Sequence, residues 1–203
     1  MNVKSVEMVA ILRGLTTQRA PEVGAALVAA GFRTIEVPLN SPDPFRTIEV
    51  LVRQHPDCLV GAGTVLTTAD VERVLGAGGK LVVAPNCDPV VIHRALESGM
   101  RVLPGIATAT EAFIAINAGA TELKLFPAAT YGPRHLKALK SVLPKHVRVF
   151  PVGGIGSQDI AGWLASGADG FGFGSELFAP AYTLPEIEKR SQALIEALRA
   201  STA

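Results

Sequence analysis

Residues 117–126 read Asn-Ala-Gly-Ala-Thr-Glu-Leu-Lys-Leu-Phe, a stretch in which a helix end containing Gly119 leads directly into a short apolar strand. Glycine suits the residue after a helix because it adopts positive φ without strain. A short apolar run behind it is typical of a buried parallel strand. The same unit returns as AAGFRTIEV at 29–37, GAGGKLVVAP at 76–85, ESGMRVLPG at 97–105 and ASGADGFGFG at 165–174. This repeat predicts a fold in which helices and parallel strands alternate.

The spacing of these units indicates how many strands there are. Neighbouring units lie about 20 to 25 residues apart, the length of one helix and one strand with short loops. Two gaps of about twice that size each contain a further strand candidate, and Met8-Val-Ala-Ile-Leu12 adds one at the start. The eight expected strands lie at 8–12, 33–37, 58–62, 81–84, 100–103, 121–126, 147–150 and 169–174. Helices are expected between them, among others at 20–30, at 70–76 and from about 184 to 199.

Eight such units favour a closed (β/α)₈ TIM barrel of the α/β class, formed by residues 1–203 as a single domain. An open, doubly wound parallel sheet is the rival architecture. No GxGxxG follows the first strand and no GxxxxGK[ST] occurs in the chain, so the nucleotide-binding motifs typical of that rival are absent. No linker, low-complexity tract or block of charge divides the chain.

Composition excludes several classes of function. The 203 residues carry a net charge of +1 and only 5% aromatic residues, which argues against a nucleic-acid or membrane surface. The two cysteines, Cys58 and Cys87, form no CxxC motif, and the four histidines show no zinc-ligand spacing, so we expect no metal site. Without a signal peptide or an apolar run of 18 residues, the chain is expected to be soluble and cytoplasmic.

Two charged residues lie within expected strands. Lys124 stands between Leu123 and Leu125, so if the leucines pack outward its side chain points into the barrel. Burial lowers the pKa of a lysine, and the neutral amine is a nucleophile for ketones. Alternatively, Lys124 reaches past the strand end into solvent. Glu36 in Thr34-Ile-Glu-Val-Pro38 is placed inside by the same alternation, either as a general acid/base or in a structural salt bridge.

Glycine-rich segments follow the last two strands, where (β/α)₈ enzymes bind phosphate through backbone N–H groups. One contains Gly153 and Gly154, and the other contains Gly174 and Ser175. Arg13, just after the first strand, would add a bidentate contact to an anion. The alternative is that these glycines only form tight turns. Two such loops at the expected strands favour phosphate.

These motifs, taken in order, resemble the bacterial 2-keto-3-deoxy-6-phosphogluconate and 2-keto-3-deoxy-6-phosphogalactonate aldolases. The resemblance covers nearly the whole chain. It runs through AILRG (10–14), IEVPLNSP (35–42), GAGTVL (61–66), APN (84–86), LKLFPA (123–128), VGGI (152–155) and GFGSELF (172–178). It implies a homotrimeric class I aldolase without metal or organic cofactor. It further implies a Schiff base on Lys124, acid/base catalysis by Glu36, and substrate contacts from Arg13, Thr64, Pro85, Val152, Gly153, Gly154, Gly174 and Ser175.

The chain resembles the galactonate branch of this family. The gluconate enzymes usually carry an arginine after the glutamate segment and a threonine before the glycine pair, where this chain has Asn40 and Val152. The implied reaction cleaves 2-dehydro-3-deoxy-6-phosphogalactonate into pyruvate and glyceraldehyde 3-phosphate in galactonate degradation. A gluconate-specific or dual-specificity aldolase remains the first alternative. A sugar-phosphate isomerase or epimerase and a non-catalytic phosphosugar-binding protein remain the others.

Overall fold

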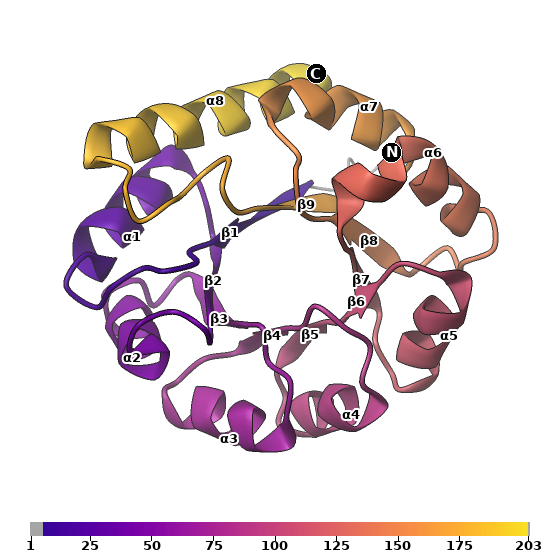
Figure 1. Cartoon of the computed structure of the whole chain (residues 1–203), viewed down its shortest axis with the longest axis horizontal. Coiled ribbons are helices and arrows are strands. Elements are labelled where there is room, and N and C mark those ends of the chain that lie inside the picture. The colour runs from indigo at the N-terminus through magenta and orange to yellow at the C-terminus, as the bar shows by residue number, and fades with distance from the viewer. Residues whose placement is uncertain (1–5, 203) are drawn as a thin grey trace.

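The structure, a computed structural model, describes residues 6–202 and is an α/β fold of alternating parallel strands and helices (Figure 1). The strands are β1 Glu7–Ile11, β2 Thr34–Pro38, β3 Leu59–Gly63, β4 Leu81–Val83, β5 Arg101–Leu103, β6 Gly105–Ile106, β7 Glu122–Leu125, β8 Arg148–Pro151 and β9 Gly170–Phe173. The helices are α1 Ala20–Ala30, α2 Pro44–Gln54, α3 Thr68–Gly76, α4 Pro89–Glu97, α5 Ala109–Asn117, α6 Ala128–Lys140, α7 Ile160–Ala165 and α8 Leu184–Thr202, with a 3₁₀ turn, η1, at Ser157–Asp159. The predicted alternation is therefore confirmed, and each of the eight predicted strands lies within one residue of an observed one.

Local sequence explains where several helices begin and end. Thr108 caps α5 by accepting a hydrogen bond from the Glu111 amide, while the Glu111 carboxylate accepts one from the Thr108 amide. This reciprocal pair satisfies two amides that the first turn of a helix leaves free. At the other end of α1, Gly31 adopts φ 119° and donates its N–H to Leu27 and Val28. The predicted role of glycine after a helix is thus observed.

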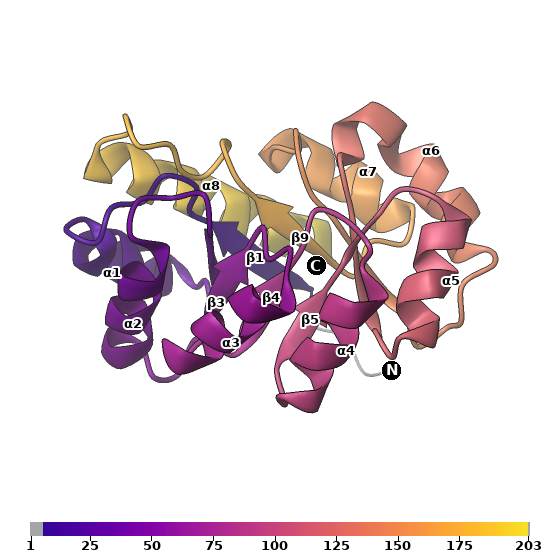
Figure 2. The same ribbon diagram turned by 60° about the horizontal axis from the view of Figure 1, so that its bottom comes forward.

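The strands form two curled parallel sheets. One has the order β5-β4-β3-β2-β1-β9 and the other has the order β6-β7-β8. A single bridge between Val152 and Gly172 connects the ends of β8 and β9. Pro104 separates β5 from β6, since proline has no N–H to donate to a ladder. Figure 1 shows the strands arranged around a centre with the helices outside them, and Figure 2 shows β3, β4 and β5 in front of β1 and β9.

Side chains alternate between the outside and the inside of the curled strands. The outward set packs under the helices and includes Leu123, Leu125, Phe171 and Phe173. A smaller buried cluster inside the strands contains Val9, Leu81, Val83, Leu103 and Phe150. On β9 the inward positions are glycines: a Cβ at Gly170 would lie 2.2 Å from the Phe150 ring, and one at Gly172 would lie 2.7 Å from Val152.

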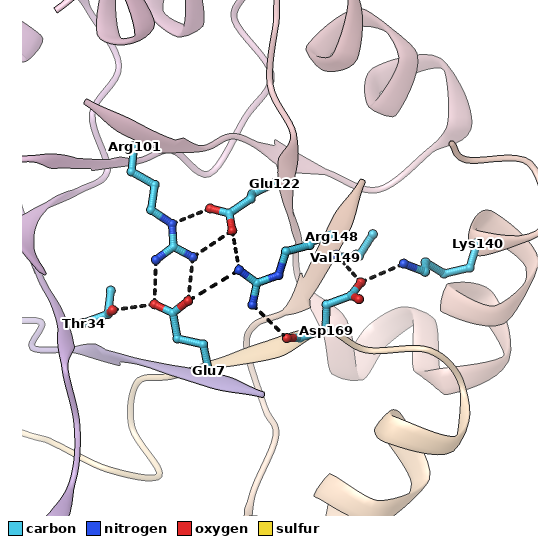
Figure 3. A network of polar contacts seen from close by, with 8 residues as sticks. All are labelled: Glu7, Thr34, Arg101, Glu122, Lys140, Arg148, Val149 and Asp169. Atoms are coloured by element: carbon cyan, nitrogen blue, oxygen red, sulfur yellow. Dashed lines mark hydrogen bonds and ion pairs between the residues drawn. The ribbon is translucent and has the colours of Figure 1, made fainter. Parts of the chain in front are cut away.

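The amino ends of the strands are joined by four inward charged residues, Glu7, Arg101, Glu122 and Arg148, which we call the base network (Figure 3). Arg101 donates two hydrogen bonds to Glu7, at 2.6 and 2.8 Å, and also binds Glu122. Arg148 donates to Glu122 at 2.7 Å. Because Glu7 and Arg101 belong to the larger sheet and Glu122 and Arg148 to the smaller one, the network links the two sheets.

The base network also fixes the charge of its members. Burial by itself raises the pKa of Glu7, but hydrogen bonds from Arg101 and Thr34 and the charges of Arg101 and Arg148 outweigh it. The pKa of Glu7 therefore lies below its usual value, and the carboxylate stays ionised at neutral pH. Partly buried charges that pair with one another in this way avoid the cost of an unpaired charge inside the protein.

Within residues 6–202, no helix combines the length and the apolar character that a bilayer span requires.

Candidate active site

A cavity of about 520 Å³ opens beside the carboxyl ends of β1, β7, β8 and β9. It brings together seven of the ten residues that the sequence singled out: Arg13, Lys124, Val152, Gly153, Gly154, Gly174 and Ser175. Glu36 is not part of the cavity lining, but it lies close enough to Lys124 and Arg13 for their charges to affect its pKa. A larger cavity of about 940 Å³ lies on the outer face between α3, α4 and α5, and none of these residues lines it.

Lys124 lies inside the strands, as predicted. Its neighbours Leu123 and Leu125 are fully buried in the outward-facing core, whereas Lys124 borders the cavity and is only 6% exposed. Burial lowers the pKa of its ammonium, the charge of Glu36 acts in the opposite direction, and the charge of Arg13 lowers it further. The alternative, in which Lys124 reaches past the strand end into solvent, does not fit this burial. A buried amine with a lowered pKa is available as a nucleophile at lower pH than an exposed lysine.

Glu36 is 1% exposed, and its Oε2 has no hydrogen-bond partner in the described part of the chain. Burial raises the pKa of this carboxyl to about 7, although the charges of Lys124 and Arg13 act to lower it. A carboxyl with this pKa is populated in both protonation states near neutrality, which suits a group that must give and take protons. Space for the carboxylate comes from Gly63, where a Cβ would lie 1.4 Å from Oε2.

Arg13 lies on the segment after β1 and is exposed at the rim of the cavity. Its Nη1 donates a hydrogen bond of 2.6 Å to Oδ1 of Asn40, which follows β2. The adjacent Gly14 amide donates to Oγ of Ser41 at 2.9 Å. The ends of β1 and β2 are thereby tied together beside the cavity.

The two glycine segments border the same cavity. Gly153 fits against Phe126, whose ring carbons would lie 3.3 Å from a Cβ at residue 153. Gly154 has φ 71°, and a Cβ there would also lie 2.7 Å from Cβ of Ala129, so both its conformation and its surroundings require glycine. Loops with so little side chain allow a ligand to approach the backbone amides closely.

Thr64 and Pro85 occupy a different position from the other candidates. Thr64 directly follows β3 and Pro85 follows β4 by two residues, but neither lines the 520 Å³ cavity. Thr64 adopts φ 57°, a conformation that is rare for a β-branched residue and often marks functional sites. Their predicted substrate contacts stay predictions.

Several cavity residues were missed from the sequence. The Phe126 ring centroid lies 4.9 Å from Nζ of Lys124, and Ile11, Ile155, Phe178 and Pro180 add apolar walls. Phe126 could have been found, because it follows Lys124 by two residues and alternation puts both on one side. Pro180 could not, because it lies in an irregular segment after β9 that no periodicity describes.

No metal centre is evident in residues 6–202, since they hold no group of three His, Cys, Asp or Glu side chains that could bind an ion. Two of the histidines, His55 and His135, are partly buried. His135 contacts the Ala107 carbonyl oxygen at 2.6 Å and stacks on Tyr131, and Nε2 of His55 is buried without a partner in the described chain. These two side chains serve in packing between elements.

Comparison with known proteins places this geometry in a family. The model of the family described as "KDPG and KHG aldolase" matches residues 1–194. The chain belongs to the KDPG and KHG aldolase family. It is 47% identical over 191 residues to the "Probable 2-dehydro-3-deoxy-6-phosphogalactonate aldolase" of Rhizobium meliloti, covering 94% of this chain and 90% of that relative. It is 42% identical over 193 residues to the 2-dehydro-3-deoxy-6-phosphogalactonate aldolase of Escherichia coli, covering 95% of this chain and 94% of that one.

Solved structures of this aldolase family are similar in fold. The one described as "Native KDPGal structure" has 41% identity and a TM-score of 0.95, covering 97% of this chain and 96% of that one. The KDPG aldolase of Legionella pneumophila, with pyruvate captured as a covalent carbinolamine, has 27% identity and a TM-score of 0.83, covering 99% of this chain and 96% of that one. The resemblance drawn from the sequence motifs is thereby confirmed, and the chain is an aldolase.

Proposed function

We propose that this aldolase cleaves 2-dehydro-3-deoxy-6-phosphogalactonate into pyruvate and glyceraldehyde 3-phosphate through a Schiff base on Lys124. The observation that carries the proposal is the buried amine of Lys124 beside the cavity, under the electrostatic influence of a buried carboxyl whose pKa is about 7. The carbinolamine in the Legionella pneumophila relative and the names of the two curated relatives support it.

The chemistry needs one amine and one proton carrier. The Lys124 amine attacks the C2 ketone to give a carbinolamine, which loses water to form an iminium ion. Removal of the C4 hydroxyl proton breaks the C3–C4 bond, and the iminium takes up the electron pair as an enamine while glyceraldehyde 3-phosphate leaves. Protonation of the enamine at C3 and hydrolysis of the resulting iminium release pyruvate and restore the amine. Glu36 moves these protons, and no metal or organic cofactor enters any step.

The phosphate would bind at the glycine segments. Gly153, Gly154, Gly174 and Ser175 all border the cavity, and the exposed Arg13 adds a cation to its lining. Binding of this remote, unreactive group holds the ketone near Lys124 and supplies part of the transition-state stabilisation.

Covalent trapping tests the mechanism directly. Incubation with pyruvate and borohydride should add one pyruvyl-derived group to the peptide that contains Lys124, and Lys124→Ala should remove both the adduct and nearly all turnover. Glu36→Gln should lower kcat with a smaller effect on KM. An isomerase or a non-catalytic sugar-binding protein would give no adduct, and labelling of another lysine would refute the assignment.

The preference for the galactonate-derived substrate rests on Val152, which borders the cavity next to the glycine pair. An apolar side chain there offers no hydrogen bond to a hydroxyl of the substrate, and the two substrates differ only in configuration at C4. We expect higher kcat/KM for the galactonate-derived substrate, and Val152→Thr should shift the ratio toward the gluconate-derived one. Equal turnover of both by the wild type would instead indicate a dual-specificity aldolase.

We also propose that the two sheets together form one closed (β/α)₈ barrel. The bridge between Val152 and Gly172 on one side, and the bonds of Arg101 to Glu122 on the other, support this arrangement. A crystal structure with continuous pairing between β8 and β9 would bear it out, and an open edge there would refute it. The homotrimer stays a prediction, for which light scattering should give three times the 21.2 kDa chain mass.

A further inference from the structure

Arg13, at the rim of the cavity, has a well-held backbone but a weakly held side chain. The backbone on either side of it is fixed, because the Leu12 amide donates to the Glu36 carbonyl at 3.0 Å and the Gly14 amide donates to Oγ of Ser41 at 2.9 Å. The Arg13 side chain is exposed, and within residues 6–202 its single hydrogen bond is the one from Nη1 to Oδ1 of Asn40, at 2.6 Å. The direction of the guanidinium therefore depends on one amide oxygen.

We propose that Asn40 is a positioning residue, whose Oδ1 holds the Arg13 guanidinium over the cavity so that it meets an anionic group of the substrate. The inference rests on the proposed function, since it assigns Asn40 a role in binding that same substrate. An arginine without this partner would still be charged, but it would have to give up rotamer freedom each time an anion bound.

The chemistry of an amide suits this task better than a carboxylate. Asn40 accepts one hydrogen bond but carries no charge, so it directs Arg13 without neutralising it. A guanidinium has five N–H donors, and the bond to Asn40 uses only one of them. The others stay available for a bidentate contact with a phosphate or carboxylate group. An aspartate at this position would compete with the substrate for the same cation.

A second consequence concerns the pKa values of Glu36 and Lys124. The charge of Arg13 lowers the pKa of Glu36 and also that of Lys124. Glu36 and Lys124 act on each other as well, and Glu176 is a further charged residue on the cavity wall. When Asn40 no longer holds Arg13, both pKa values should rise, so both limbs of the pH–rate profile should move to higher pH.

A double-mutant cycle separates this role from a merely structural one. The variants are Asn40→Ala, Arg13→Ala and the double variant, with Asn117→Ala as the matched control, because Asn117 is an exposed asparagine at the end of α5 away from the cavity. Steady-state kinetics with the phosphorylated substrate and urea unfolding are measured for each. Asn40→Ala should raise KM roughly three- to tenfold, which corresponds to about 0.7–1.4 kcal/mol and lies within the usual net contribution of a single hydrogen bond, with kcat changed much less. It should have no further effect when Arg13 is already alanine.

Further readouts make the outcome decisive. Asn40→Gln, which keeps an amide oxygen, should recover part of the lost affinity. In Asn40→Ala, both limbs of the profile of kcat/KM against pH should lie at higher pH than in the wild type. Equal effects of Asn40→Ala with and without Arg13, or a KM the same as that of Asn117→Ala, would overturn the inference. If the wild type shows neither turnover nor borohydride trapping, the proposed function itself fails. Normal wild-type turnover with an additive cycle refutes only the role of Asn40.

Discussion

Replacing Glu36 by Gln removes a buried carboxyl that is costly to ionise, and we expect the variant to be more stable than the wild type at pH 8. The folded protein raises the pKa of this group from 4.5 to about 7. Below pH 4.5 both the folded and unfolded states carry the protonated form. Between pH 4.5 and about 7, the unfolded state releases the proton while the folded state retains it, so the stability of the wild type falls as pH rises.

The size of this loss follows from the two pKa values. Each pKa unit corresponds to about 1.4 kcal/mol, so the interval from 4.5 to about 7 represents about 3 kcal/mol. Glutamine has nearly the same shape and does not ionise, so it escapes this cost. The attraction of the Lys124 and Arg13 charges is already contained in the pKa of about 7, so the expected net gain stays at about 3 kcal/mol.

Urea unfolding at pH 4.5 and pH 8 measures the effect. The free energy of unfolding of Glu36→Gln, relative to the wild type, should rise by about 3 kcal/mol between these pH values, while its kcat is strongly reduced. The exposed Glu196→Gln on α8 is the matched control and should show little change. A stability difference that is equal at both pH values would refute the reasoning, since it would mean that folding does not raise the pKa of Glu36.

Three other substitutions test separate parts of the structure. Gly63→Ala should displace the Glu36 carboxylate, because the new Cβ would lie 1.4 Å from Oε2, and should lower kcat at least tenfold with an unchanged circular-dichroism spectrum; normal kcat would contradict this geometry. Arg101→Met should cost about 3 kcal/mol in urea unfolding because it leaves two carboxylates of the base network without a main partner, and a loss near zero would show that the network adds no stability. Gly154→Ala should raise KM for the phosphorylated substrate without preventing borohydride trapping with pyruvate, which carries no phosphate. Loss of trapping in that variant would contradict this assignment, because it would place residue 154 beside the pyruvyl part of the substrate and not beside the phosphate.

Strand positions could be predicted because local rules determine them. A glycine after each helix and the following apolar run mark a βα unit within a few residues of sequence. Pro104 and the short strand after it were missed, because an apolar run does not show that a proline interrupts the ladder. The positive φ of Thr64 was equally invisible, since threonine carries no preference for that conformation.

The candidate site was predictable where alternation determines the direction of a side chain, as for Lys124 and Glu36. The base network obeys the same rule: Glu122 precedes Lys124 by two residues, and Arg148 precedes Phe150 by two. Its ion pairs could not be predicted, because they depend on which strands face each other across the interior. The bond from Arg13 to Asn40 joins residues 27 positions apart and likewise needs the fold.

The glycines on the inner side of β9 make the packing of side chains in the interior asymmetric. At residues 170 and 172 this strand contributes backbone only, and the ring of Phe150 and the side chain of Val152 take up the space beside it. The cavity lies on this side of the molecule, next to β8, β9 and β1. Of these two glycines, Gly172 borders the cavity, and a methyl group added there would collide with Val152, which borders it too, and so alter the room for a ligand without replacing Lys124 or Glu36. Selection for ligand size and selection for bond cleavage thus act on different strands, so one can change during evolution while the other is kept.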